Sequence, residues 1–212
     1  MNRSKATVFW GVGLLLLGIL LLLQNLRVLP SLVETIWMAL FAVGGATFIG
    51  VYFADQERWW ALIPGGALLG IAGIFALETF FPGNGALAGI VFLLVLGLTF
   101  LAVFVFHREN WWAVIPGGVL LTTAVVTFLD HATTDFETGS IMMLGLAATF
   151  AVLSRIETPQ GRMRWPLIPA AVLLAIGLLL LASSVGWAPW VISLLLIAGG
   201  AYMVLRSLGR AL

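Results

Sequence analysis

Long apolar runs alternate with short polar connections along the whole chain. The runs are continuous and rich in Leu, Ala and Gly, without the strict alternation of a half-buried strand. Most approach the roughly 20 residues that an α-helix needs to cross the hydrocarbon core of a bilayer. The pattern therefore predicts an all-α integral membrane protein with eight transmembrane helices, at about 8–23, 33–53, 60–80, 86–106, 112–129, 139–154, 165–183 and 187–205.

One short motif opens three of these runs. Residues 59–66 read WWALIPGG, residues 111–118 read WWAVIPGG, and residues 164–171 are a weaker version, RWPLIPAA. Pro64 and Pro116 are 52 positions apart, and Pro116 and Pro169 are 53 apart. A period this regular indicates a supersecondary unit repeated in tandem. We predict four tandem parallel-repeat hairpins of about 52 residues, at about 7–57, 58–109, 110–162 and 163–212, which form a single transmembrane domain over 1–212.

The motif has a structural interpretation. An amphipathic indole prefers the membrane–water interface, and a proline costs little in the first turn of a helix. Small residues allow a neighbouring helix to approach, as in the small-xxx-small spacing of Gly66 with Gly70 and of Gly85 with Gly89. A binding site in a broken helix is the alternative, which the position near the membrane surface disfavours. The candidate motif residues are Trp60, Pro64, Gly65, Gly66, Trp112, Pro116, Gly117, Gly118, Trp165 and Pro169.

Composition excludes a soluble domain, because 62% of the residues are hydrophobic and only 9% are charged. The charges also predict an orientation. Arg27 is the single Lys or Arg in the connections on one side, whereas nine lie on the other: Arg3, Lys5, Arg58, Arg108, Arg155, Arg162, Arg164, Arg206 and Arg210. Short loops rich in Lys and Arg stay in the cytoplasm, so both termini are expected there.

Chemistry is sparse within the predicted spans. We expect no ionisable residue at mid-membrane depth, which argues against proton or ion coupling. The hydroxyls there are expected to bond to helix carbonyls or to neighbouring helices: Thr47, Thr99, Thr122, Thr123, Thr127, Thr149 and Ser193. His107 and His131 are both assigned to connections. The absence of cysteine excludes thiol catalysis, disulfides and thiolate metal sites.

One polar connection has the donors of a metal site. It contains Asp130, His131, Asp135 and Glu137, which could hold Ca²⁺ or a transition metal. No familiar ligand spacing fits these residues, and a solvated loop is the preferred interpretation. We therefore predict no catalytic residue, no metal and no cofactor.

The Trp openings resemble the LiaI/LiaF-type transmembrane region of bacterial envelope proteins, at 9–25, 59–69, 111–121 and 165–180. The hairpin rhythm is also similar to that of HdeD-like acid-resistance membrane proteins. LiaF-type proteins carry a soluble carboxy-terminal domain, whereas this chain stops at Leu212. The resemblance implies a bacterial cytoplasmic (inner) membrane protein without catalytic residues, with a place in envelope-stress regulation.

The expected function is therefore non-enzymatic. The chain is predicted to be an envelope accessory or regulatory protein, or a subunit of a larger membrane complex. Its expected partners are membrane lipid and other membrane proteins or further copies of itself, without nucleic acid. The alternatives are a channel or carrier for a small neutral or lipid-like solute, and a membrane enzyme acting on lipids.

Overall fold

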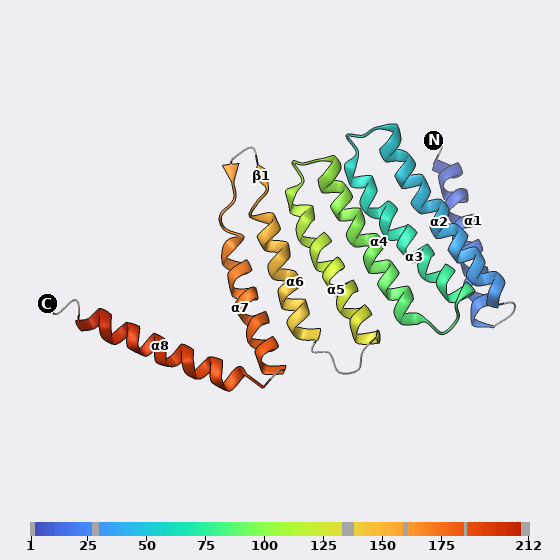
Figure 1. The fold of residues 1–212 in the computed structure, drawn as a ribbon. Coiled ribbons are helices and arrows are strands. Elements are labelled where there is room, and N and C mark those ends of the chain that lie inside the picture. The colour runs from blue at the N-terminus through green and yellow to red at the C-terminus, as the bar shows by residue number, and fades with distance from the viewer. Residues whose placement is uncertain (1–2, 27–29, 133–137, 159–160, 185, 209–212) are drawn as a thin grey trace. The chain divides into compact units, whose positions relative to one another are not determined.

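The computed structural model describes residues 3–26, 30–132, 138–158, 161–184 and 186–208 (Figure 1). These residues form eight α-helices, two short 3₁₀ turns and two short strands. The order is α1 (Arg3–Asn25), α2 (Pro30–Ala54), η1 (Trp59–Ala61), α3 (Leu62–Phe80), α4 (Gly85–Phe106), η2 (Trp111–Ala113), α5 (Val114–Ala132), α6 (Thr138–Leu153), β1 (Glu157–Thr158), β2 (Gly161–Arg162), α7 (Leu167–Ser184) and α8 (Ala188–Leu208). The prediction of a helical protein is confirmed.

Five of the described helical segments are long and apolar enough to cross a membrane. They are Leu32–Ala54, Trp59–Phe80, Gly85–Phe106, Trp111–Ala132 and Leu167–Ser184, and two shorter apolar stretches lie at Gly11–Leu23 and Thr138–Leu153. Length and composition thus indicate a membrane protein.

Several predicted ends are wrong by a few residues. Gln24 and Asn25 belong to α1 rather than to a connection, and Asp130 and His131 form part of the last turn of α5. No Gly or Pro lies nearby to stop either helix, and a polar residue is well tolerated in a terminal turn. His107 does lie in a connection, directly after α4.

The prolines of the motif determine how three helices begin. Pro64, Pro116 and Pro169 are each the third residue of their helix, within the first turn as predicted. A proline cannot donate to the carbonyl four residues earlier, and its ring crowds that carbonyl. The chain therefore enters through a tighter turn, which is η1 before α3 and η2 before α5. At the start of α7, Ile168 N donates to Trp165 O, three residues back, at 3.2 Å.

Two connections match in their backbone hydrogen bonds. Arg58 N donates to Asp55 O at 3.0 Å, and Asn110 N donates to His107 O at 2.9 Å. The residues before η1 and η2, Arg58 and Asn110, have almost the same backbone angles, φ −83° and −86° with ψ 47° in both. Similar turns thus join α2 to α3 and α4 to α5, although their side chains differ.

The connection from α6 to α7 is built differently, because it contains two short paired strands. Its strands β1 and β2 pair antiparallel, with Glu157 opposite Arg162 and Thr158 opposite Gly161. Gly161 has a φ of +100°, which a glycine adopts without the strain of a side chain. Strands of two residues carry no periodic pattern, so the sequence could not reveal them.

The chain divides into two compact units, Met1–Val95 and Leu96–Leu212, and the boundary falls inside α4. In the first unit, α2 and α3 form the main helix pair. In the second unit, α5, α6 and α7 follow one another side by side (Figure 1). Half of the buried hydrophobic residues in the described part of the chain are alanines, including Ala61, Ala72, Ala113, Ala124 and Ala147. Helix pairs in lipid gain stability from such close packing, because burial from water contributes little there.

Candidate functional site

The tryptophan at the second position of each motif packs against a phenylalanine of the preceding helix. Trp60 meets Phe48 edge-to-face with ring centroids 6.3 Å apart, and Trp112 meets Phe100 in the same way at 6.2 Å. Trp165 repeats the contact with Phe150, again at 6.2 Å. Edge-to-face geometry is the favoured arrangement for an aromatic pair. Trp60 is still 50% exposed and Trp165 47% exposed, so each ring combines this contact with an open face.

The first glycine of two motifs faces a glycine of the preceding helix. A Cβ built on Gly65 would lie 2.8 Å from Ile49 Cδ1 and 3.4 Å from Gly45 O. A Cβ on Gly117 would lie 2.9 Å from Leu101 Cδ2. These glycines are buried and allow two backbones to approach closely.

The second glycine differs between the motifs. Gly66 is buried. A Cβ on Gly118 would clash with the side chain of Thr149, and a Cβ on Gly145 would clash with Thr122. A reciprocal glycine–threonine arrangement thus joins α5 to α6.

The two predicted small-xxx-small pairs differ in whether their glycines contact a neighbouring helix. Gly70 contacts α4, since its Cβ would lie 2.9 Å from Phe92 Cδ2. Gly89 has no atom within 4 Å of such a Cβ, so the predicted close contact is absent at this described position. The partners Gly45, Gly97, Phe48 and Phe100 were missed, and their spacing of 52 residues is the signal that could have found them.

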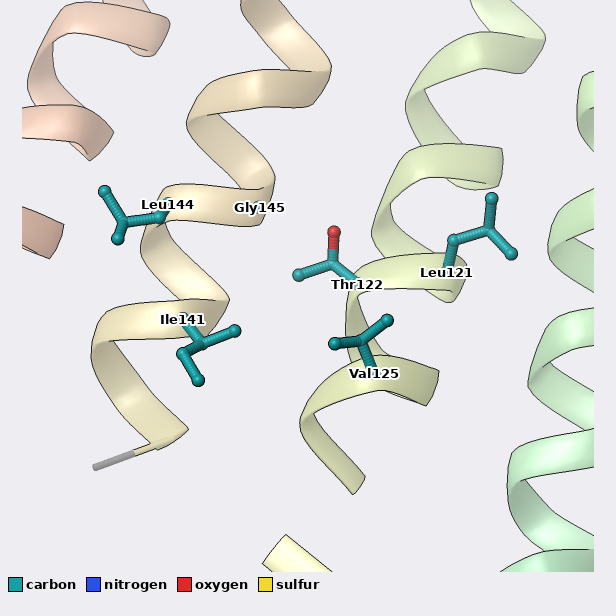
Figure 2. Close-up of a pocket in the computed structure, with 6 residues that line it drawn as sticks. All are labelled: Leu121, Thr122, Val125, Ile141, Leu144 and Gly145. Carbon is teal, nitrogen blue, oxygen red and sulfur yellow. The ribbon is translucent and has the colours of Figure 1, made fainter. Parts of the chain in front are cut away.

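An apolar cavity of about 310 Å³ lies between α5 and α6 (Figure 2). Thr122 and Val125 project from α5 toward α6, and Ile141 projects from α6 toward α5 (Figure 2). Leu121, Leu144 and Gly145 complete the lining. The cavity is open at the protein surface, and Val125 is 49% exposed. Its lining suits an apolar group better than a charged one.

A second apolar cavity of about 380 Å³ lies between α6 and α7. Five alanines form much of its wall, and three leucines complete it: Ala147, Ala148, Ala151, Ala170, Ala171, Leu144, Leu167 and Leu174. Ala147 and Ala170 are buried where the earlier helix pairs have facing glycines. An apolar cavity therefore lies on each side of α6, one next to α5 and one next to α7.

A polar cavity of about 490 Å³ adjoins the start of α7. Its lining includes three arginines of the connection between α6 and α7, with three further residues: Arg155, Arg162, Arg164, Ser154, Met163 and Leu167. All three arginines are exposed. Leu167 lines both this cavity and the apolar one, so the two openings are adjacent.

The connection from α4 to α5 also contains polar side chains. His107 Nδ1 lies 3.4 Å from Glu109 Oε1, and Arg108 Cζ lies 4.7 Å from the centre of the Phe104 ring. Asn110 is buried, and its Oδ1 accepts a hydrogen bond from Trp112 Nε1 at 3.3 Å. These contacts hold the turn that positions Trp112.

The structure describes only part of the connection that contains the possible metal ligands. Asp130 and His131 lie at the end of α5, whereas Asp135 and Glu137 fall outside the described residues. Within the part of the chain that the structure describes, no three His, Cys, Asp or Glu residues are grouped to hold a metal ion. The candidate spans do contain ionisable residues, but only within two residues of an end: Glu34, Glu78, Asp130 and His131.

The hydroxyls of the helices mostly bond to their own backbone. Thr47, Thr123, Thr127, Thr149 and Ser193 each donate to the carbonyl four residues earlier, at 2.7 to 2.9 Å. This confirms the expected back-bonding for these five residues. The donor hydrogen of each of these hydroxyls is therefore satisfied within its own helix.

No protein-family model, curated protein or solved structure matches this chain. The resemblance to LiaI/LiaF-type and HdeD-like regions therefore stays a prediction.

Proposed function

We propose that this chain is a non-enzymatic multi-pass membrane protein that acts by binding within the membrane. It serves as an envelope accessory or regulatory protein, or as a subunit of a larger membrane complex. The observation that carries the proposal is the pair of open apolar cavities on the two sides of α6. A surface of this kind suits an apolar helix or a lipid, whereas a charged solute would lose its hydration there.

The proposed topology has eight spans in four tandem hairpins that all enter the membrane in the same direction. It is supported by the edge-to-face contacts of Trp60, Trp112 and Trp165, which recur at the motif spacing. Both termini are placed in the cytoplasm of a bacterial inner membrane, on the basis of the nine-to-one distribution of Lys and Arg. The likeness to the LiaI/LiaF-type region supports the same location.

A carrier for a small neutral or lipid-like solute is the second candidate, and the apolar cavities favour it over an ion-coupled transporter. The back-bonded hydroxyls supply few free donors for a polar path. A lipid-acting enzyme would need polar groups that converge near one interface.

The test is purification of the tagged chain from its native membrane in mild detergent. We expect a stable complex for the wild type and its loss for Val125→Trp, which fills the cavity between α5 and α6. Leu98→Trp is the control, because Leu98 is exposed on α4 and lines neither apolar cavity. Gradient-driven uptake of a solute by reconstituted liposomes would contradict the proposal.

A further inference from the structure

The helix pair α6–α7 lacks the large side chains that fill the space between the two helices in the pairs α2–α3 and α4–α5. Ile49 lies over Gly65 in the pair α2–α3, and Leu101 lies over Gly117 in the pair α4–α5. Ile49 and Leu101 each directly follow the phenylalanine that meets the motif tryptophan. Ala151 directly follows Phe150, which meets Trp165, and therefore takes this position on α6. Alanine is too short to cover the neighbouring helix, and the cavity of about 380 Å³ lies at this place.

The open space has a defined length and direction. Leu167 is the first residue of α7, and Leu174 lies seven residues further along the same helix. At a rise of about 1.5 Å per residue, the apolar groove extends about 10 Å along α7. It begins where the chain enters the helix, next to the polar cavity.

The mouth of this groove is cationic. Arg155, Arg162 and Arg164 line the polar cavity, and Leu167 belongs to both cavities. Glu157 is the single acidic residue in this connection, and it lies opposite Arg162 in the register of the two strands. The connection 155–164 therefore keeps a net charge of +2, from three arginines and one glutamate.

The shorter connections use their arginines locally. Arg58 Nε donates to Asp55 Oδ2 at 2.9 Å, and Arg108 lies over the Phe104 ring. Neither arginine is among the residues that line the described cavities. The combination of a cationic pocket and an apolar groove thus marks the α6–α7 junction.

We propose that this junction binds one anionic phospholipid. The arginines hold the phosphate through charge-assisted hydrogen bonds, and the upper part of one acyl chain lies in the alanine groove. Lipid binding at this junction requires only that the chain lies in a membrane, so it is independent of the function proposed above. Guanidinium groups match phosphate oxygens in geometry as well as charge.

The experiment measures lipids retained by the full chain in nanodiscs that contain phosphatidylglycerol and phosphatidylcholine with identical acyl chains. We expect the wild type to retain phosphatidylglycerol selectively. Arg162→Gln with Arg164→Gln should lower that selectivity on the order of tenfold. Arg58→Gln with Arg108→Gln removes the same number of charges outside the described cavities, and this matched control should leave the selectivity unchanged.

A second variant tests the groove. Ala151→Leu restores the bulk present at Leu101 and should displace the retained lipid while preserving the thermal transition. Ala171→Leu, on the opposite wall, gives an independent test if the first variant folds poorly. Retention of phosphatidylglycerol at the wild-type level by both the arginine and the alanine variants would overturn the proposal. Displacement of the retained lipid by soluble glycerol phosphate as effectively as by phosphatidylglycerol would also overturn the proposal, because the acyl chain would then contribute nothing to binding.

Discussion

Gly97 on α4 and Gly117 on α5 face each other so closely that a Cβ on either would meet the other's carbonyl oxygen. The distances would be 3.3 Å from Gly97 to Gly117 O and 3.2 Å in the reverse direction. Gly45 and Gly65 show the same relationship between α2 and α3. In lipid, where burial from water contributes little, this close approach is a main source of helix association.

Gly117→Leu should therefore destabilise the protein. A leucine would overpack Leu101 and the backbone of Gly97, at a cost of about 1–3 kcal/mol. Gly89→Leu is the control, because a Cβ there would meet no atom within 4 Å. Thermal unfolding in detergent measures both, and equal transitions for the two variants would show that the glycine contact is unimportant.

The glycine–threonine contact between α5 and α6 should appear as coupling between two substitutions. Gly118→Ala places a methyl against Thr149 and should destabilise the protein. Thr149→Ala removes the two nearest atoms of that side chain, so the double variant should be less destabilised than the sum of its parts by about 0.5–3 kcal/mol. Strict additivity would mean that the two residues do not touch.

The aromatic contact at the motif should be measurable by a double-mutant cycle. Phe100→Leu with Trp112→Leu should give a coupling of about 0.5–1.5 kcal/mol, as expected for an edge-to-face pair. The cycle of Phe150 with Trp165 should give a similar value, since the ring distance is 6.2 Å in both. A coupling in one pair only would argue against equivalent packing at the two sites.

The proposed topology predicts where reporter fusions will be found. Fusions at Gly83 and Thr134 should lie outside the cytoplasm, and fusions at Gln56 and Gly161 inside. The physical reason is retention of connections rich in Lys and Arg on the cytoplasmic side. Activity of an external reporter at Gly161 would overturn the eight-span arrangement.

Hydrophobic runs and prolines allowed much of the helical order to be predicted. Pro64 and Pro116 mark helix starts, and Gly83, which has a φ of +87°, lies in the connection predicted between the spans 60–80 and 86–106. Helix ends without such residues, as at Asn25 and His131, were placed too early. A polar side chain in a terminal turn is compatible with either helix or loop, so it carries little information.

The candidate site was harder to predict, because it depends on side chains from two helices. The motif led to Gly117 and Trp112, but their partners Gly97 and Phe100 sit inside an apolar run with no local signal. The cavity at Ala151 arises from the absence of a larger side chain. Only a comparison of equivalent positions in three dimensions makes such an absence visible.

The spacing of these contacts also bears on how the length of the chain can change. Removing residues 62–113 would join Ala61 to Val114 and bring Gly117 opposite Gly45, in place of Gly65. Because 52 residues contain two helices, the direction of every later helix would be unchanged. We expect such a shortened chain to insert and fold, as checked by a monodisperse profile in detergent, so that the protein can gain or lose length in whole hairpins without redesign of its packing.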